Sequence, residues 1–154
     1  MRFIKLFILI APFFVLAQQN NLDFHLNSKI NKNKEIKLIY SDVNIDASED
    51  DQYSQILANK LLNNLNKNGL SVIFPQDLKA TCPSKNCDNI NEIIKDESFI
   101  YIFIVTQTSG ARTTINGTIY QNGKVDGGFT SYRSYWTNSR FDNLSLSIAE
   151  KLLE

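Results

Sequence analysis

Two short apolar runs, residues 36–40 and 70–74, flank a stretch in which apolar residues recur at helical spacing. Short runs rich in β-branched and aromatic residues are typical of strands that are buried on both faces. The intervening stretch predicts a helix with Ser48 as its N-cap and Asn68-Gly69 as its C-terminal stop. Its core-facing stripe consists of Tyr53, Ile56, Leu57, Leu61, Leu62 and Leu65. Strand, helix and strand in this order predict two parallel strands joined by a right-handed crossover.

The second half of the chain favours a meander of strands. Residues 99–105 form an unbroken apolar and aromatic run, which predicts the central strand of the sheet. Residues 112–121 alternate between the two faces, as a half-buried strand does. Asn122-Gly123 predicts a type I′ hairpin turn, because both central positions of that turn need a positive φ. Residues 124–136 are expected to return as the partner strand, with a bulge or break at Gly127-Gly128.

Two further helices complete the predicted fold. A short amphipathic helix is expected after Asp88, and a longer helix closes the chain, with Ser139 and Asp142 as a capping box. The apolar stripe of the closing helix comprises Phe141, Leu144, Ile148, Ala149 and Leu152. The element order β-α-β-α-β-β-β-α predicts an α/β (α+β) fold, a mixed sheet with helices packed on it. We expect a single domain over residues 35–154, built as three layers or as an open two-layer sandwich.

The first seventeen residues have the parts of a secretory signal peptide. Arg2 and Lys5 precede a short apolar run, and Val15 and Ala17 are the small residues expected before a cleavage site. The run is far shorter than the ~20 residues of a membrane-spanning helix. We therefore expect cleavage after Ala17, with an uncleaved N-terminal anchor as the alternative. Residues 18–34 are rich in Asn and Lys and show no sustained periodicity, which predicts a flexible N-terminal arm.

Composition and export change how the cysteines are interpreted. The 154 residues are 43% hydrophobic, which is enough for one domain with a hydrophobic core. The 16 Lys and Arg are balanced by 16 Asp and Glu, which disfavours a dedicated nucleic-acid-binding protein. In an oxidising compartment, Cys82 and Cys87 are expected to form a disulfide worth about 2 kcal/mol, with a reactive thiol as the alternative. Because His25 is the single histidine, a metal site at these cysteines is not expected.

No motif for catalysis or cofactor binding stands out. Gly127-Gly128 is not followed by the helix and Lys of a phosphate-binding loop. An acidic group follows the first apolar run, at Asp42, Asp46, Asp50 and Asp51. These carboxylates could ligate Ca²⁺ or Mg²⁺, but we favour a solvated loop beside a helix N-terminus, where acidic residues are stabilised by the helix dipole. We therefore expect no enzymatic activity, no cofactor and no metal.

Aromatic and arginine residues gather near the end of the last predicted strand and form a candidate partner-binding surface. The candidates are Tyr120, Tyr132, Arg133, Tyr135, Trp136 and Arg140. Strict alternation would place Tyr132 and Trp136 on one face, and Arg133 and Tyr135 on the other. Tyr, Trp and Arg are the residues enriched at interface hot spots. The alternative is that these side chains belong to the core or to ordinary sheet surface.

The element order and several local phrases resemble a known periplasmic domain. The phrases are IKLIY, LSVIF, CPSKNC, FIYIFIVTQTSG, INGTIYQNGKV and the terminal IAEKLL. In this order they are similar to the domain shared by the TolB N-terminal region, the CsgG curli-secretion lipoprotein and LpoB-type activators of penicillin-binding proteins. The resemblance implies a binding module of the cell envelope with no catalytic residues. The chain departs from the lipid-anchored members in lacking the lipid-modified Cys, and its hairpin is too short and charged for a membrane-inserting one.

These observations favour an exported, non-enzymatic accessory or scaffold protein of the cell envelope that binds a partner protein, in the periplasm or outside the cell. One alternative is a secreted effector or inhibitor of toxin or immunity type. A less favoured alternative is an exported hydrolase, which is difficult to reconcile with a single histidine in the predicted arm. Without Arg2 and Lys5 the chain has two fewer basic than acidic groups, so no nucleic-acid partner is expected.

Overall fold

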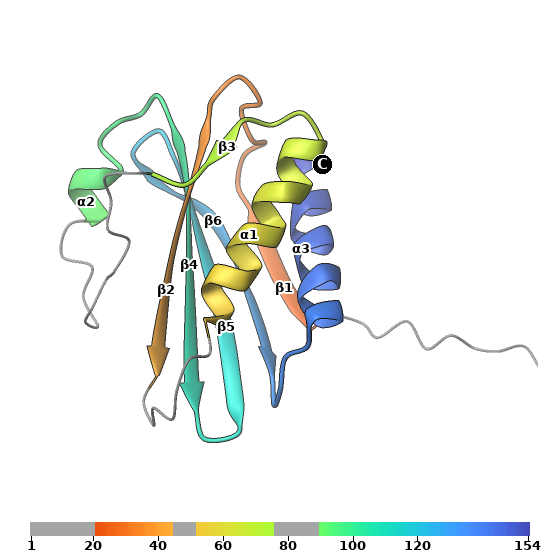
Figure 1. Cartoon of the computed structure of the whole chain (residues 1–154). Helices are drawn as coiled ribbons and strands as arrows, with labels where there is room; N and C mark the ends of the chain where they lie inside the picture. The colour runs from red at the N-terminus through yellow and green to blue at the C-terminus, as the bar shows by residue number, and fades with distance from the viewer. Residues whose placement is uncertain (1–20, 45–51, 76–89) are drawn as a thin grey trace, which may run out of the picture.

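A six-stranded mixed sheet with two long helices on one face makes up the computed structural model, which describes residues 21–44, 52–75 and 90–154 (Figure 1). The strand order is β1-β6-β5-β4-β2-β3. The strands are β1 (Leu22–Leu26), β2 (Ile36–Asn44), β3 (Val72–Ile73), β4 (Ile100–Ser109), β5 (Arg112–Gln121) and β6 (Lys124–Arg133). The helices are α1 (Tyr53–Lys67), α2 (Ile90–Ile93) and α3 (Asn138–Leu153). The predicted fold class, a mixed sheet with helices packed on it, is confirmed.

The β2–α1–β3 unit has the predicted parallel pairing, with Ile36 opposite Val72. The predicted N-cap of its helix is wrong. The helix begins at Tyr53 after Gln52, and Ser48 lies outside the described residues. The side chain of Asp42 in β2 receives hydrogen bonds from both the backbone N–H and the hydroxyl of Ser54, at 2.9 and 2.6 Å. A carboxylate from a neighbouring strand therefore satisfies an N–H of the first helical turn.

The β5–β6 hairpin turns where the sequence predicts, with φ of 54° at Asn122 and 73° at Gly123. Its register does not stay constant. Tyr120 lies opposite Val125 but Ile119 lies opposite Gly127, so Asp126 is the extra residue of a β-bulge. The bulge falls one residue before the predicted position. A one-residue slip exchanges the two faces for every residue that follows it in the strand.

Residues 22–26 correct the expectation of a flexible arm, because they form edge strand β1, antiparallel to β6. Leu22, Phe24 and Leu26 alternate with exposed residues and pack against the main core. A side chain at Gly127 would place its Cβ 2.4 Å from the His25 carbonyl oxygen. The glycine in β6 thus permits the close approach of β1, a contact between segments that are distant in sequence.

The main core lies between the sheet and the pair α1 and α3. All five predicted stripe residues of α3 are buried. The predicted capping box is wrong, since Thr137 is the N-cap and its side chain accepts a hydrogen bond from the Arg140 N–H at 3.3 Å. Asp142 instead accepts a 2.5 Å hydrogen bond from Lys60 of α1. Lys60 and Asp142 therefore help to hold the two helices together.

The opposite face of the sheet carries a smaller apolar cluster beneath α2. Its buried members are Ile39, Ile94, Tyr101 and Phe103. Elsewhere this face presents partly buried polar residues of β5 and β6, including Thr114, Asn116 and Thr130. Within the described ranges, no helix is both long and apolar enough to cross a membrane. The predicted signal peptide, Asp88 and both cysteines lie outside those ranges.

Candidate interaction surface

Two exposed tyrosines lie where β6 ends and the chain enters α3. Tyr132 is 45% exposed and Tyr135 is 59% exposed. Large aromatic side chains this exposed are candidates for contact with another molecule. Each tyrosine has an arginine over its ring, and we call the four residues the Tyr–Arg surface: Arg112, Tyr132, Tyr135 and Arg140.

The Tyr135–Arg140 pair is held by several contacts. The Arg140 guanidinium carbon lies 4.1 Å from the centroid of the Tyr135 ring. Its Nη1 donates to the Tyr135 carbonyl at 2.9 Å, and its Nη2 donates to the Tyr135 hydroxyl at 3.2 Å. The backbone N–H of Arg140 is fixed in turn by the Thr137 cap. The beginning of α3 therefore positions this pair on a rigid element.

The Tyr132–Arg112 pair joins neighbouring strands. The Arg112 guanidinium carbon lies 4.3 Å from the centroid of the Tyr132 ring. Tyr132 lies opposite Thr114, on the face away from α1 and α3, because of the bulge at Asp126. Continued from the turn without a bulge, the register would place Tyr132 opposite Thr113, whose side chain is buried. Arg112 was not among the predicted residues, because its pairing depends on that bulge.

Trp136 does not share a face with Tyr132, because β6 ends at Arg133 and strand alternation ends with it. Trp136 is only 8% exposed and stacks on Phe141 of α3, with ring centroids 4.9 Å apart. Its indole N–H is buried and has no hydrogen-bond partner in the described part of the chain. Trp136 is therefore a core residue that anchors the segment between β6 and α3.

Tyr120 and Arg133 lie apart from the two exposed pairs. Tyr120 packs edge-on against Phe103 beneath α2, at the other end of the sheet, with ring centroids 5.4 Å apart. Burial raises the pKa of Tyr120. Arg133 is half-buried on the core-facing side of β6, with a buried Nε. Of the six predicted residues, only Tyr132, Tyr135 and Arg140 thus belong to the exposed surface.

The acidic residues do not form a recognisable metal site where the structure describes them. Besides Ser54, the hydroxyl of Thr106 donates to the Asp42 carboxylate. Asp46, Asp50 and Asp51 lie outside the described residues. No group of three or more His, Cys, Asp and Glu residues in the described ranges could hold a metal ion. The Asp42 carboxylate therefore links β2 to α1 and β4 through its hydrogen bonds with Ser54 and Thr106.

Solved structures share the fold at low sequence identity. The sequence matches no protein-family model and no curated protein. A PelC dodecamer structure from Paraburkholderia phytofirmans matches with a TM-score of 0.52 at 12% identity, covering 87% of this chain and 94% of that one. A variant PelC dodecamer matches similarly, with a TM-score of 0.52, 13% identity, and coverage of 86% and 95%. TolB from Acinetobacter baumannii gives a TM-score of 0.45 at 10% identity, covering 85% of this chain but 29% of TolB.

Proposed function

We propose that this chain is an exported, non-enzymatic accessory or scaffold protein of the cell envelope that binds a partner protein through the Tyr–Arg surface. The observation that carries the proposal is the pair of exposed tyrosines, each held beneath an arginine. The sequence resemblance to a periplasmic binding domain supports the envelope location. The proposal includes no reaction, because the sequence contains no catalytic motif.

Preorganisation is the physical reason why these pairs suit binding. Ordering a free side chain at an interface costs about 0.5–1.5 kcal/mol. Tyr135 and Arg140 already constrain each other through the ring contact and two hydrogen bonds. Truncation of such a hot-spot residue typically weakens binding by about 2 kcal/mol or more. An exposed, pre-ordered Tyr–Arg pair therefore gives large contact area at low entropic cost.

Site-specific photo-cross-linking tests the proposed surface. A photoreactive amino acid placed at position 135 should cross-link a partner protein in the intact envelope. The same amino acid at position 146 is the matched control, since Leu146 is 47% exposed on α3. Equal cross-linking from both positions would contradict a partner site at Tyr135. A cross-link to a second copy of the chain would assign the surface to self-assembly, and the PelC structures are dodecamers.

Export has a test of its own. Intact-mass measurement of protein recovered from the envelope or the medium should show a chain that begins at Gln18. A full-length mass in that fraction would contradict cleavage after Ala17. The proposed Cys82–Cys87 bond is checked on the same material by thiol labelling after denaturation without reductant. Labelling of both thiols would contradict the bond.

A further inference from the structure

The two arginines of the Tyr–Arg surface form no ion pair with a carboxylate in the described part of the chain, where the ion pair joins Lys60 to Asp142. The guanidinium of Arg112 contacts a tyrosine ring and donates to no acceptor within the described ranges. Of the five N–H donors of Arg140, one on each Nη bonds to Tyr135. Both guanidinium groups therefore retain most of their donors for another molecule.

Contact with a tyrosine ring makes these donors suitable for a carboxylate. The ring attracts the cation but contributes no negative charge that would neutralise it. A planar guanidinium matches the two oxygens of a carboxylate and binds them with parallel hydrogen bonds. Because Tyr132 and Tyr135 already restrict the two arginines, a carboxylate binds them at a lower cost in side-chain entropy.

Three described carboxylates belong to elements beside this surface, and none of them forms an ion pair with its arginines. Asp42 accepts hydrogen bonds from two hydroxyl groups, and Asp142 is paired with Lys60. Asp23 of β1 lies on the same face of the sheet as Tyr132. The positive charges of the two arginines are therefore not neutralised by direct contact with any described carboxylate.

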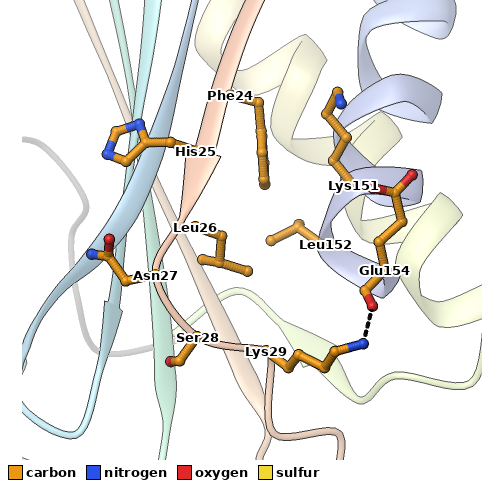
Figure 2. A pocket seen from close by; sticks show the side chains of 9 residues that line it. All are labelled: Phe24, His25, Leu26, Asn27, Ser28, Lys29, Lys151, Leu152 and Glu154. Carbon is orange, nitrogen blue, oxygen red and sulfur yellow. Dashed lines mark hydrogen bonds between the residues drawn. The ribbon is translucent and has the colours of Figure 1, made fainter.

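A groove at the other end of α3 has a different balance of charge. There the Lys29 ammonium donates to the main-chain oxygen of Glu154 at 2.5 Å (Figure 2). The side-chain carboxylate of Glu154 lines the same groove together with Lys151. Cations and carboxylate oxygens thus occur together in the groove, whereas the Tyr–Arg surface presents cations alone among its four residues.

We propose that the partner segment that binds the Tyr–Arg surface is acidic, with one Asp or Glu carboxylate on Arg112 and another on Arg140. The exposed tyrosine rings supply apolar contact beside each carboxylate. The proposal rests on the proposed function, because it names the chemistry of the partner at the same surface. An anionic membrane fits less well, since membrane-binding patches typically hold ~4–8 clustered Lys or Arg.

A phage-displayed library of short random peptides, panned on the full mature chain, tests the proposal. We expect enrichment of peptides that contain Asp or Glu and lose affinity in Tyr135→Ala. Their affinity should also fall at least about tenfold between about 0.05 and 0.5 M salt. Tyr135-dependent peptides without acidic residues would overturn the acidic partner and leave the proposed function intact. The absence of any Tyr135-dependent peptide would also overturn the acidic partner, while cross-linking from position 135 tests the proposed function independently.

Charge variants locate the carboxylates of an enriched synthetic peptide. Arg112→Gln should weaken its binding at least about tenfold, and Arg112→Lys should weaken it less, because lysine keeps the charge but not the planar fork. Arg112 is exposed, so neither change should alter the melting temperature by more than a few degrees. Lys151→Gln, which removes an exposed charge at the far end of α3, is the matched control and should change the affinity by less than about twofold. Equal affinities of Arg112→Gln and Lys151→Gln would overturn the proposal.

Two further measurements separate other anionic occupants. The acidic residues Asp46, Glu49, Asp50 and Asp51 lie outside the described ranges, and their replacement by Asn and Gln should leave the peptide affinity within about twofold. A tenfold rise would assign the arginines to this segment of the chain itself and overturn the proposal. Vesicles of phosphatidylglycerol and phosphatidylethanolamine should bind the wild-type chain and Arg112→Gln equally. Arg112-dependent binding to these vesicles would overturn the proposal in favour of a membrane surface.

Discussion

The face of the sheet beneath α1 and α3 differs from the face turned away from them. On the helix side, Leu38, Ile102 and Ile115 are fully buried and belong to the same core cluster as the buried residues of α1 and α3. On the other side, a small apolar cluster beneath α2 gives way to polar side chains and to the Arg112–Tyr132 pair. The first face therefore carries the main core of the fold, while the second face and its margin near Tyr135 are available for contact.

The largest loss of stability is expected from a substitution in the helix-side core. Leu61 of α1 is fully buried, so Leu61→Ala should lower the free energy of unfolding by about 2–5 kcal/mol. Val125 is 56% exposed, and Val125→Ala should change that free energy by no more than about 0.5 kcal/mol. Denaturant unfolding measures both. Similar losses in the two variants would contradict the unequal roles of the two faces.

A smaller effect is expected where β5 and β6 pack most tightly. A Cβ at Gly117 would lie 2.1 Å from atoms of the Phe129 ring on the helix side. Gly117→Ala should therefore destabilise the fold by about 1–3 kcal/mol. In Gly117→Ala/Phe129→Leu the ring is gone, so the double variant should lose less stability than the sum of the two single losses. Strict additivity in denaturant unfolding would show that the two side chains do not compete for space.

The smallest effect is expected on the other face of the sheet, where two tyrosines make the melting temperature depend on alkaline pH. Burial raises the pKa of Tyr101 and Tyr120 above the ordinary 10.0, and the Asp96 charge adds to the effect at Tyr101. The folded protein then holds these protons more tightly than the unfolded chain. Their contribution to stability is complete below the unfolded pKa and is lost as pH rises through the folded pKa. The melting temperature should therefore fall above about pH 10, and less steeply in Tyr120→Phe. Identical pH profiles would contradict burial of the Tyr120 phenol beneath α2.

The elements that the sequence predicts well are those determined by nearby residues. The type I′ turn at Asn122-Gly123 depends only on residues that tolerate a positive φ, and it occurs as predicted. The stripe of α3 follows from helical periodicity alone. Both predicted N-terminal caps are wrong. Asp42, six residues before Ser48 and in another element, supplies the bond at α1, and Thr137 caps α3 two residues before Ser139.

Features that depend on distant residues could not be predicted from local patterns. β1 has only five residues and forms where Gly127 lets it approach β6. The bulge at Asp126 reverses the face on which Tyr132 lies and brings it to Arg112. Of the six candidate residues, Tyr120, Arg133 and Trp136 lie apart from the Tyr–Arg surface. A binding role for Tyr132, Tyr135 and Arg140 stays a prediction.

The most direct test of the proposed function measures binding and stability in the same variant. Tyr135→Ala should reduce retention of the purified chain by the solubilised native envelope about tenfold or more. Because the ring is 59% exposed, its melting temperature should stay within a few degrees of the wild-type value. Leu146→Ala, at an exposed position elsewhere on α3, should change neither quantity. Unchanged retention of Tyr135→Ala, or a loss of retention that accompanies a large fall in melting temperature, would contradict a binding role for this surface.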